Sequence, residues 1–210
     1  MPRHSRLVAA GYPHHLTQRG NNREPVFFDE EDRLTYLGLL EHYTRKYQLD
    51  IWAYCLMTNH VHLLVVPHEE SALGQGIGLV NMTFTQHLNR KYKRTGRIWQ
   101  NRFFSSVVDT DAYLWAVARY IENNPVSAGM VEEAVAYDWS SAQHHLGGDI
   151  DPVLKGSSWL SQADRDEYRS FLKKDDKRIT TMIAHATRNG RPICSPERLS
   201  YFEELFNRIF

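Results

Sequence analysis

Two hydrophobic spacings alternate along the chain, and together they predict its helices and strands. The 3.6-residue spacing of an amphipathic helix covers residues 29–47, 76–93 and 111–124. Apolar runs of strand length cover residues 12–18, 51–57, 61–66 and 98–108. Asp29 is a suitable N-cap for the first helix, Pro125 would stop the third, and Thr58 with Asn59 is suited to a tight hairpin turn.

The order of these elements predicts the fold class. A strand–helix–strand–strand–helix–strand–helix order indicates an antiparallel sheet with helices packed on it, which is an α+β architecture. Within the first two helices, the spacing places Leu34, and Met82 or Phe84, among the residues that face the core.

The last third of the chain differs in composition from the rest. A short helix is expected over residues 137–146, after which the sequence becomes more polar. We therefore expect a boundary near residue 148, with a first domain over 1–148 and a mainly helical C-terminal extension over 149–210. Its helices are predicted over residues 162–172, 177–187 and 196–209, with a loop at 189–192. The extension could stabilise the first domain, cover a site or contact a partner.

Length and composition are those of a folded protein of ordinary size. The chain has 210 residues, 42% of them hydrophobic. No apolar run approaches the roughly 20 residues that a membrane span requires, so we expect no membrane partner. The N-terminal segment lacks the apolar centre of a secretory signal, and Cys55 and Cys194 have neither metal-ligand nor redox spacing. These features favour a reducing, cytoplasmic location.

The charge distribution points to a polyanionic partner although the total charge does not. There are 25 basic and 25 acidic residues, so the formal net charge is zero. Residues 71–108 nevertheless contain six basic side chains and no acidic one, and residues 1–23 contain four basic side chains and no acidic one. Such a local field can steer nucleic acid even on a neutral chain. A solvated basic face without a partner would give the same pattern.

Two histidines carry the first chemical signal. His60 and His62 lie two apart in the run after the predicted hairpin, so their imidazoles share one face of a strand. Neutral imidazoles at that spacing can chelate a divalent ion. Histidine pairs in strands are also common without a metal.

The second signal is the spacing of Tyr120 and Asn124. In a helix these residues are i and i+4 and share a face. A phenol can attack phosphorus and form a covalent ester, and an amide oxygen can complete the shell of a hard cation. On spacing alone, a core tyrosine with a helix-capping asparagine explains the pattern better.

Several motifs together resemble one family. His60-Val61-His62 resembles the HUH signature, two histidines around a bulky apolar residue, and residues 54–64 resemble the core of the single-tyrosine insertion-sequence transposases. Residues 120–131 (YIENNPVSAGMV) resemble the tyrosine segment of the REP-associated branch of that family. The motifs TQRGNN at 17–22, WQNRF at 99–103 and WSS at 139–141 also fit this branch. The resemblance runs in order over roughly residues 6–147.

The resemblance implies a ferredoxin-like HUH sandwich and a specific chemistry. His60 and His62 would hold Mg²⁺ or Mn²⁺, with Asn124 as a third ligand. Tyr120 would attack single-stranded DNA, leave a 5′-phosphotyrosine and release a 3′-hydroxyl, so that strands at palindromic hairpins are cut and rejoined. Glu122 stands where family members often carry histidine, which leaves its role open.

The same resemblance implies hairpin DNA as the partner and a monomer rather than a homodimer. The residues expected to bind this DNA are basic: Arg3, Arg6, Arg19, Arg90, Lys91, Lys93, Arg94, Arg97 and Arg102. Most of them would contact phosphates, whereas Arg3 and Arg6 would reach a groove or an unpaired base. Two alternatives remain. One is a catalytically retired regulator that only binds hairpins, and the other is an RNA-binding module with incidental histidines.

Overall fold

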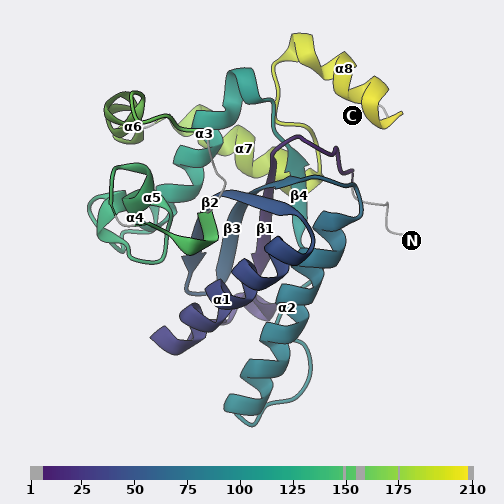
Figure 1. Cartoon of the computed structure of the whole chain (residues 1–210), viewed down its shortest axis with the longest axis vertical. Helices are drawn as coiled ribbons and strands as arrows, with labels where there is room; N and C mark the ends of the chain where they lie inside the picture. Colours follow the sequence, from purple (N-terminus) through teal and green to yellow (C-terminus); the bar gives the residue numbers. More distant parts are fainter. Residues whose placement is uncertain (1–6, 149, 155–158, 175, 208–210) are drawn as a thin grey trace.

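The computed structural model describes residues 7–148, 150–154, 159–174 and 176–207 (Figure 1). Arg3 and Arg6, which are expected to bind DNA, lie outside the described residues, as does the end of the helix predicted over 196–209. No helix in the described ranges combines the length and the apolar character needed to cross a bilayer.

A four-stranded antiparallel sheet forms the centre of the fold. Its strands are β1 (His14–Arg19), β2 (Leu49–Met57), β3 (His60–Pro67) and β4 (Phe104–Val107), in the order β2-β3-β1-β4. Thr58 and Asn59 form the predicted turn between β2 and β3. The run predicted as a strand over 98–108 is shorter than expected. Trp99 makes only an isolated bridge to Gly20, because its indole turns into the core and donates to the Asn81 carbonyl.

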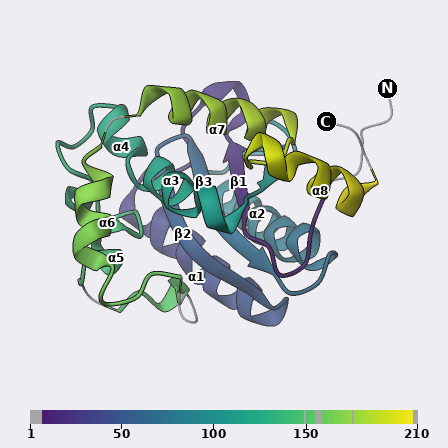
Figure 2. The ribbon, with the colours of Figure 1, turned by 90° about the horizontal axis from the view of Figure 1, so that it is seen from above.

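Helices cover both faces of this sheet. On one face lie α1 (Glu30–Lys46) and α2 (Ala72–Lys91), and on the other lie α3 (Thr110–Glu122) and α7 (Lys177–Asn189), as Figure 2 shows. The strands alternate accordingly. Val61 and Leu63 point into the α1–α2 core, whereas Cys55 and Leu64 point into the α3–α7 core. The predicted α+β, ferredoxin-like architecture is therefore confirmed.

The first two helices lie near their predicted positions, although α2 begins at Ala72, four residues before its predicted start. Asp29 caps α1, because its carboxylate accepts from the Asp32 N–H at 2.9 Å. Leu34 is 57% exposed, contrary to prediction. Of the alternatives Met82 and Phe84 in α2, Phe84 is the one in the core, since it is fully buried and Met82 is 50% exposed. The buried stripe of α1 contains Tyr36 and Leu40, and Leu34 lies about 200° around the helix from Tyr36.

Shorter helices follow α3, two of them before residue 148 and two in the extension. They are α4 (Asn124–Ser127), α5 (Ala142–His145), α6 (Arg165–Leu172) and α8 (Pro196–Phe206), with 3-10 turns at Asn21–Arg23, Ala134–Ala136 and Pro152–Leu154. Tyr168 and Ile183 of the extension share one hydrophobic cluster with Val117 and Ile121 of α3. The boundary predicted at residue 148 stays a prediction, but the extension and the first domain have a common core.

Candidate active site

Two elements, β3 and α3, bring His60, His62 and Tyr120 together. His60 and His62 on β3 face α3, and their ring centroids are 5.0 Å apart. Tyr120 extends from α3 toward the sheet, and its ring centroid lies 5.5 Å from that of His62. The alternation of β3 explains the geometry, because Val61 between the two histidines is fully buried on the opposite face.

A third histidine, His15 on β1, belongs to the same cluster. Its ring stacks on His62 at a centroid distance of 5.3 Å and meets Tyr120 at 5.4 Å. The pairing of β1 with β3 sets Thr17 opposite His62, so His15 is the diagonal neighbour of His62 on the same face. Sequence reasoning missed His15, because nothing in a single strand discloses the register of its partner.

The two predicted ligands are suited to a divalent cation. Burial first, and then Arg19, lowers the pKa of His60 to about 4, and burial also lowers the pKa of His62 well below its usual value. Both rings are therefore neutral at neutral pH. Among the described residues, neither Nε2 atom has a hydrogen-bond partner, whereas both Nδ1 atoms are engaged.

Asn124 lies after the end of α3 rather than in it. Its Nδ2 donates to the Tyr120 carbonyl at 2.7 Å, so the amide caps the helix that carries Tyr120. Its Oδ1 is left for other partners. Over the described ranges, no three His, Cys, Asp or Glu side chains form a group that could hold a metal. The two imidazoles thus fit part of the shell of a divalent ion, which phosphate or water oxygens could complete, whereas the contacts of Asn124 among the described residues are with α3 and not with the histidines.

Tyr120 lies in a positive local field. Its phenol is half-buried, and burial raises its pKa, while the charges of Arg19 and Arg188 lower it. Arg19, one of the residues predicted to bind DNA, is thus near the phenol. Arg188, in the last turn of α7, acts on the same phenol, although it is not among the residues predicted to bind DNA.

Glu122 points away from this cluster. Two residues after Tyr120 on α3, it is fully buried and accepts hydrogen bonds from Ser141 and His145 at 2.5 Å and from Tyr168 at 2.8 Å. These partners come from the segment that includes α5 and from α6. Glu122 therefore joins the end of α3 to the helices beyond it, and none of its hydrogen bonds in the described ranges is with His15, His60 or His62.

Of the six basic residues over 90–102 that were predicted to bind DNA, two form ion pairs within the described ranges and four do not. The Lys91 ammonium lies within 2.9 Å of Asp29, Glu31 and Asp32, and the Arg94 guanidinium lies 3.5 Å from Glu24. The remaining four are exposed and have no ion pair within the described ranges: Arg90, Lys93, Arg97 and Arg102. The segment around Arg97 and Arg102 adjoins β1, because the Gln100 N–H donates to the Arg19 carbonyl at 2.9 Å.

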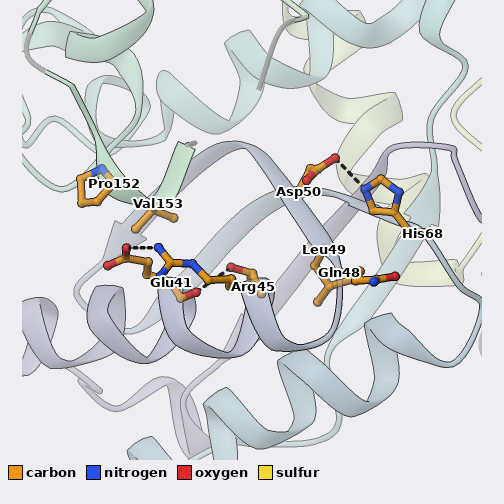
Figure 3. A pocket seen from close by; sticks show the side chains of 9 residues that line it. Glu41, Arg45, Gln48, Leu49, Asp50, His68, Pro152 and Val153 are labelled. Carbon is orange, nitrogen blue, oxygen red and sulfur yellow. Dashed lines mark hydrogen bonds and ion pairs between the residues drawn. The ribbon is translucent and has the colours of Figure 1, made fainter. Parts of the chain in front are cut away.

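One of two hollows in the surface adjoins Tyr120, and the other lies away from Tyr120 and the histidines. One of about 860 Å³ lies between α3 and the extension, and its lining includes Tyr120, Lys173 and Lys177. Another, of about 470 Å³, lies at the α1 side of the sheet (Figure 3). Its polar walls are internally paired, Glu41 with Arg45 and Asp50 with His68, and none of the cluster residues lines it. Of these two hollows, the first adjoins Tyr120 and the second does not.

Comparison with known proteins identifies the family to which this chain belongs. Residues 10–124, more than half of the chain, match the family described as "Transposase IS200 like". A Haemophilus influenzae protein assigned as a REP-associated tyrosine transposase is 31% identical over an alignment of 144 residues that covers 64% of this chain and 77% of the relative. The fold is similar to a solved structure of a REP-associated tyrosine transposase bound to a REP hairpin, with a TM-score of 0.60 and 17% identity, covering 77% of this chain and 98% of that one. On the family match and the curated relative, the chain belongs to the IS200-like transposases and, within them, to the REP-associated tyrosine transposases.

Proposed function

We propose that this protein cuts and rejoins single-stranded DNA at hairpin sites through a covalent bond to Tyr120. The observation that carries the proposal is the convergence of the Tyr120 phenol with two neutral histidines whose Nε2 atoms are available. The structural neighbour bound to a REP hairpin supports hairpin DNA as the substrate class. The hollow beside Tyr120, with Lys173 and Lys177 in its wall, offers room for the strand next to the scissile phosphate.

The proposed cleavage conserves the number of phosphoester bonds. The Tyr120 oxygen attacks the phosphorus, and the bond from phosphorus to the 3′-oxygen breaks. The phenol loses its proton, and the departing 3′-oxygen gains one, which leaves a 5′-phosphotyrosine and a 3′-hydroxyl. A 3′-hydroxyl can then attack the phosphotyrosine and release Tyr120. Because each step exchanges one ester for another, joining needs no ATP.

Residues around the phenol would favour this attack. Arg19 and Arg188 stabilise negative charge on the Tyr120 oxygen, as their effect on its pKa indicates, and they would also stabilise the phosphate. His60 and His62, with Asn124, would hold Mg²⁺ or Mn²⁺. A divalent ion there would polarise the phosphate and stabilise the phenolate. The tyrosine and both histidines belong to one chain, which favours a monomer.

Metal removal tests the proposal. With a labelled single-stranded hairpin from the organism's own intergenic repeats and Mg²⁺ or Mn²⁺, we expect a covalent protein–DNA adduct on a denaturing gel. EDTA should lower the initial rate of adduct formation by roughly 10²- to 10³-fold, because a bound metal contributes several kcal/mol to such a transition state. Restoring excess Mn²⁺ should restore the rate. Tight hairpin binding without any adduct would instead identify a retired regulator.

The unengaged arginines predict a salt-dependent contact with the hairpin. Changing Arg90, Arg97 and Arg102 together to glutamate should reduce the slope of log Kd against log salt by about 2–3, since each lost phosphate contact removes roughly 0.7 to 0.9. Binding of the metal-free protein is measured by fluorescence anisotropy over a salt series. Lys91→Gln is the matched control: its ammonium is already paired with three carboxylates, so its slope should change less than that of Arg97→Glu. An unchanged slope in the triple variant would remove this surface from the interface.

A further inference from the structure

A buried hydrogen-bond chain joins His62 to the C-terminal extension. The His62 Nδ1 lies 3.0 Å from the His15 Nε2, and the His15 Nδ1 lies 2.7 Å from the Thr187 hydroxyl on α7. That hydroxyl in turn donates to the Ile183 carbonyl at 3.0 Å. His15 and Thr187 are each 1% exposed, and His62 is 4% exposed. Water therefore does not compete for these contacts, and the chain has few alternative arrangements.

The Ile183 carbonyl, at the end of this series of hydrogen bonds, determines which atom is the donor in each of them. The Ile183 carbonyl can only accept, so the Thr187 proton points to it and the Thr187 oxygen must accept from His15. His15 thus carries its proton on Nδ1, and as a neutral ring its Nε2 accepts from the His62 Nδ1–H. His62 is left with an unprotonated Nε2. Its lone pair is the one that a divalent cation requires.

His60 is held in the same tautomer by hydrogen bonds through the adjacent Asn59. Its Nδ1 lies 2.6 Å from the Asn59 Oδ1, and the Asn59 Nδ2 donates to the Arg23 carbonyl at 2.8 Å. The second bond orients the amide so that its oxygen faces His60, which must therefore donate from Nδ1. Both histidines consequently present Nε2 lone pairs. Only the route through His15 and Thr187 depends on the extension.

We propose that His15 and Thr187 are positioning residues that hold His62 in its metal-binding tautomer, and that α7 is thereby part of the metal site. This inference rests on the proposed function. Partners that orient a ligating histidine from behind commonly contribute 10- to 100-fold to metal affinity. The extension then has a role beyond packing, because its Thr187 determines which nitrogen of a β3 histidine carries the proton.

Three threonine variants test this role in the full chain. Thr187→Val keeps the shape and removes the acceptor, so Mn²⁺ affinity measured by isothermal titration calorimetry should fall 10- to 100-fold. Thr187→Ser keeps the hydroxyl and should bind Mn²⁺ close to wild type. Thr181→Val is the matched control, because Thr181 lies on the same helix and also donates to the carbonyl four residues back, at 2.8 Å, but is exposed. Its Mn²⁺ affinity should not change.

Long-range ¹H–¹⁵N NMR of the metal-free protein reads the tautomer directly. We expect wild-type His62 to be protonated at Nδ1 and bare at Nε2, with a mixture of tautomers in Thr187→Val. A wild-type His62 protonated at Nε2 would overturn the inference. Wild-type Mn²⁺ affinity in Thr187→Val would overturn it while leaving the proposed function intact. Failure of the wild type to bind Mn²⁺ would overturn both the metal-dependent function and the positioning role.

Discussion

Tyr120→Phe is expected to abolish the covalent adduct while hairpin binding persists. The substitution removes only the phenolic oxygen, which is the proposed nucleophile, so no ester to phosphorus can form. The phenylalanine ring keeps the packing against His15 and His62, whose centroids lie 5.4 Å and 5.5 Å from it. In the described part of the chain the Tyr120 hydroxyl has no hydrogen-bond partner, so stability should be little affected. Adduct is quantified on denaturing gels and Kd by anisotropy.

Tyr113→Phe is the matched control for that experiment. Tyr113 lies on the same helix, is also half-buried, and its hydroxyl likewise has no hydrogen-bond partner in the described ranges. This variant should form adduct at the wild-type rate. An adduct that survives Tyr120→Phe would show that another residue is the nucleophile. Loss of adduct together with loss of hairpin binding would mean that Tyr120 acts in recognition rather than in chemistry.

Local signals in the sequence were sufficient to predict the main strands and helices and to place His60 and His62 on one face of a strand. Asp29 indicated the start of α1 because an N-cap depends only on residues within one turn. The turn at Thr58 and Asn59 indicated the β2–β3 hairpin, and strand alternation placed His60 and His62 on one face. Tyr120 was predicted as a site residue only from the resemblance of its segment to a family, since on spacing alone a core tyrosine with a helix-capping Asn124 explained the pattern better.

Residues that depend on tertiary pairing could not be found in this way. His15 joins the cluster through the β1–β3 register, and Thr187 and Arg188 join it because α7 packs on the same face of the sheet. Nothing in the sequence of α7 indicates that its last turn contacts a histidine 172 residues earlier. The exposure of Leu34 has the same kind of cause. Helical spacing predicts the apolar stripe of α1, but which residues of that stripe are buried depends on the neighbouring helix.

The buried hydrogen bonds of Glu122 explain the role of this residue at a position where family members often carry histidine. Its carboxylate accepts from Ser141, His145 and Tyr168, and all four side chains are buried. Burial first, and then the charge of Glu122, raises the pKa of the Tyr168 phenol well above its usual value, so that phenol remains a donor. A single carboxylate therefore satisfies three donors from two segments, the one that includes α5 and the one that forms α6.

Glu122→Ala is accordingly expected to lower the free energy of unfolding by about 3–5 kcal/mol, because three buried donors lose their acceptor and a cavity remains. Urea denaturation followed by tryptophan fluorescence measures the change. Glu133→Ala is the control: Glu133 is exposed, pairs with Lys173 at only 3.4 Å, and should cost less than about 0.5 kcal/mol. Since Glu122 lies on the side of α3 away from Tyr120, adduct formation per folded molecule should stay near wild type. A stable Glu122→Ala protein that forms no adduct would contradict the structural role and move Glu122 into the chemistry.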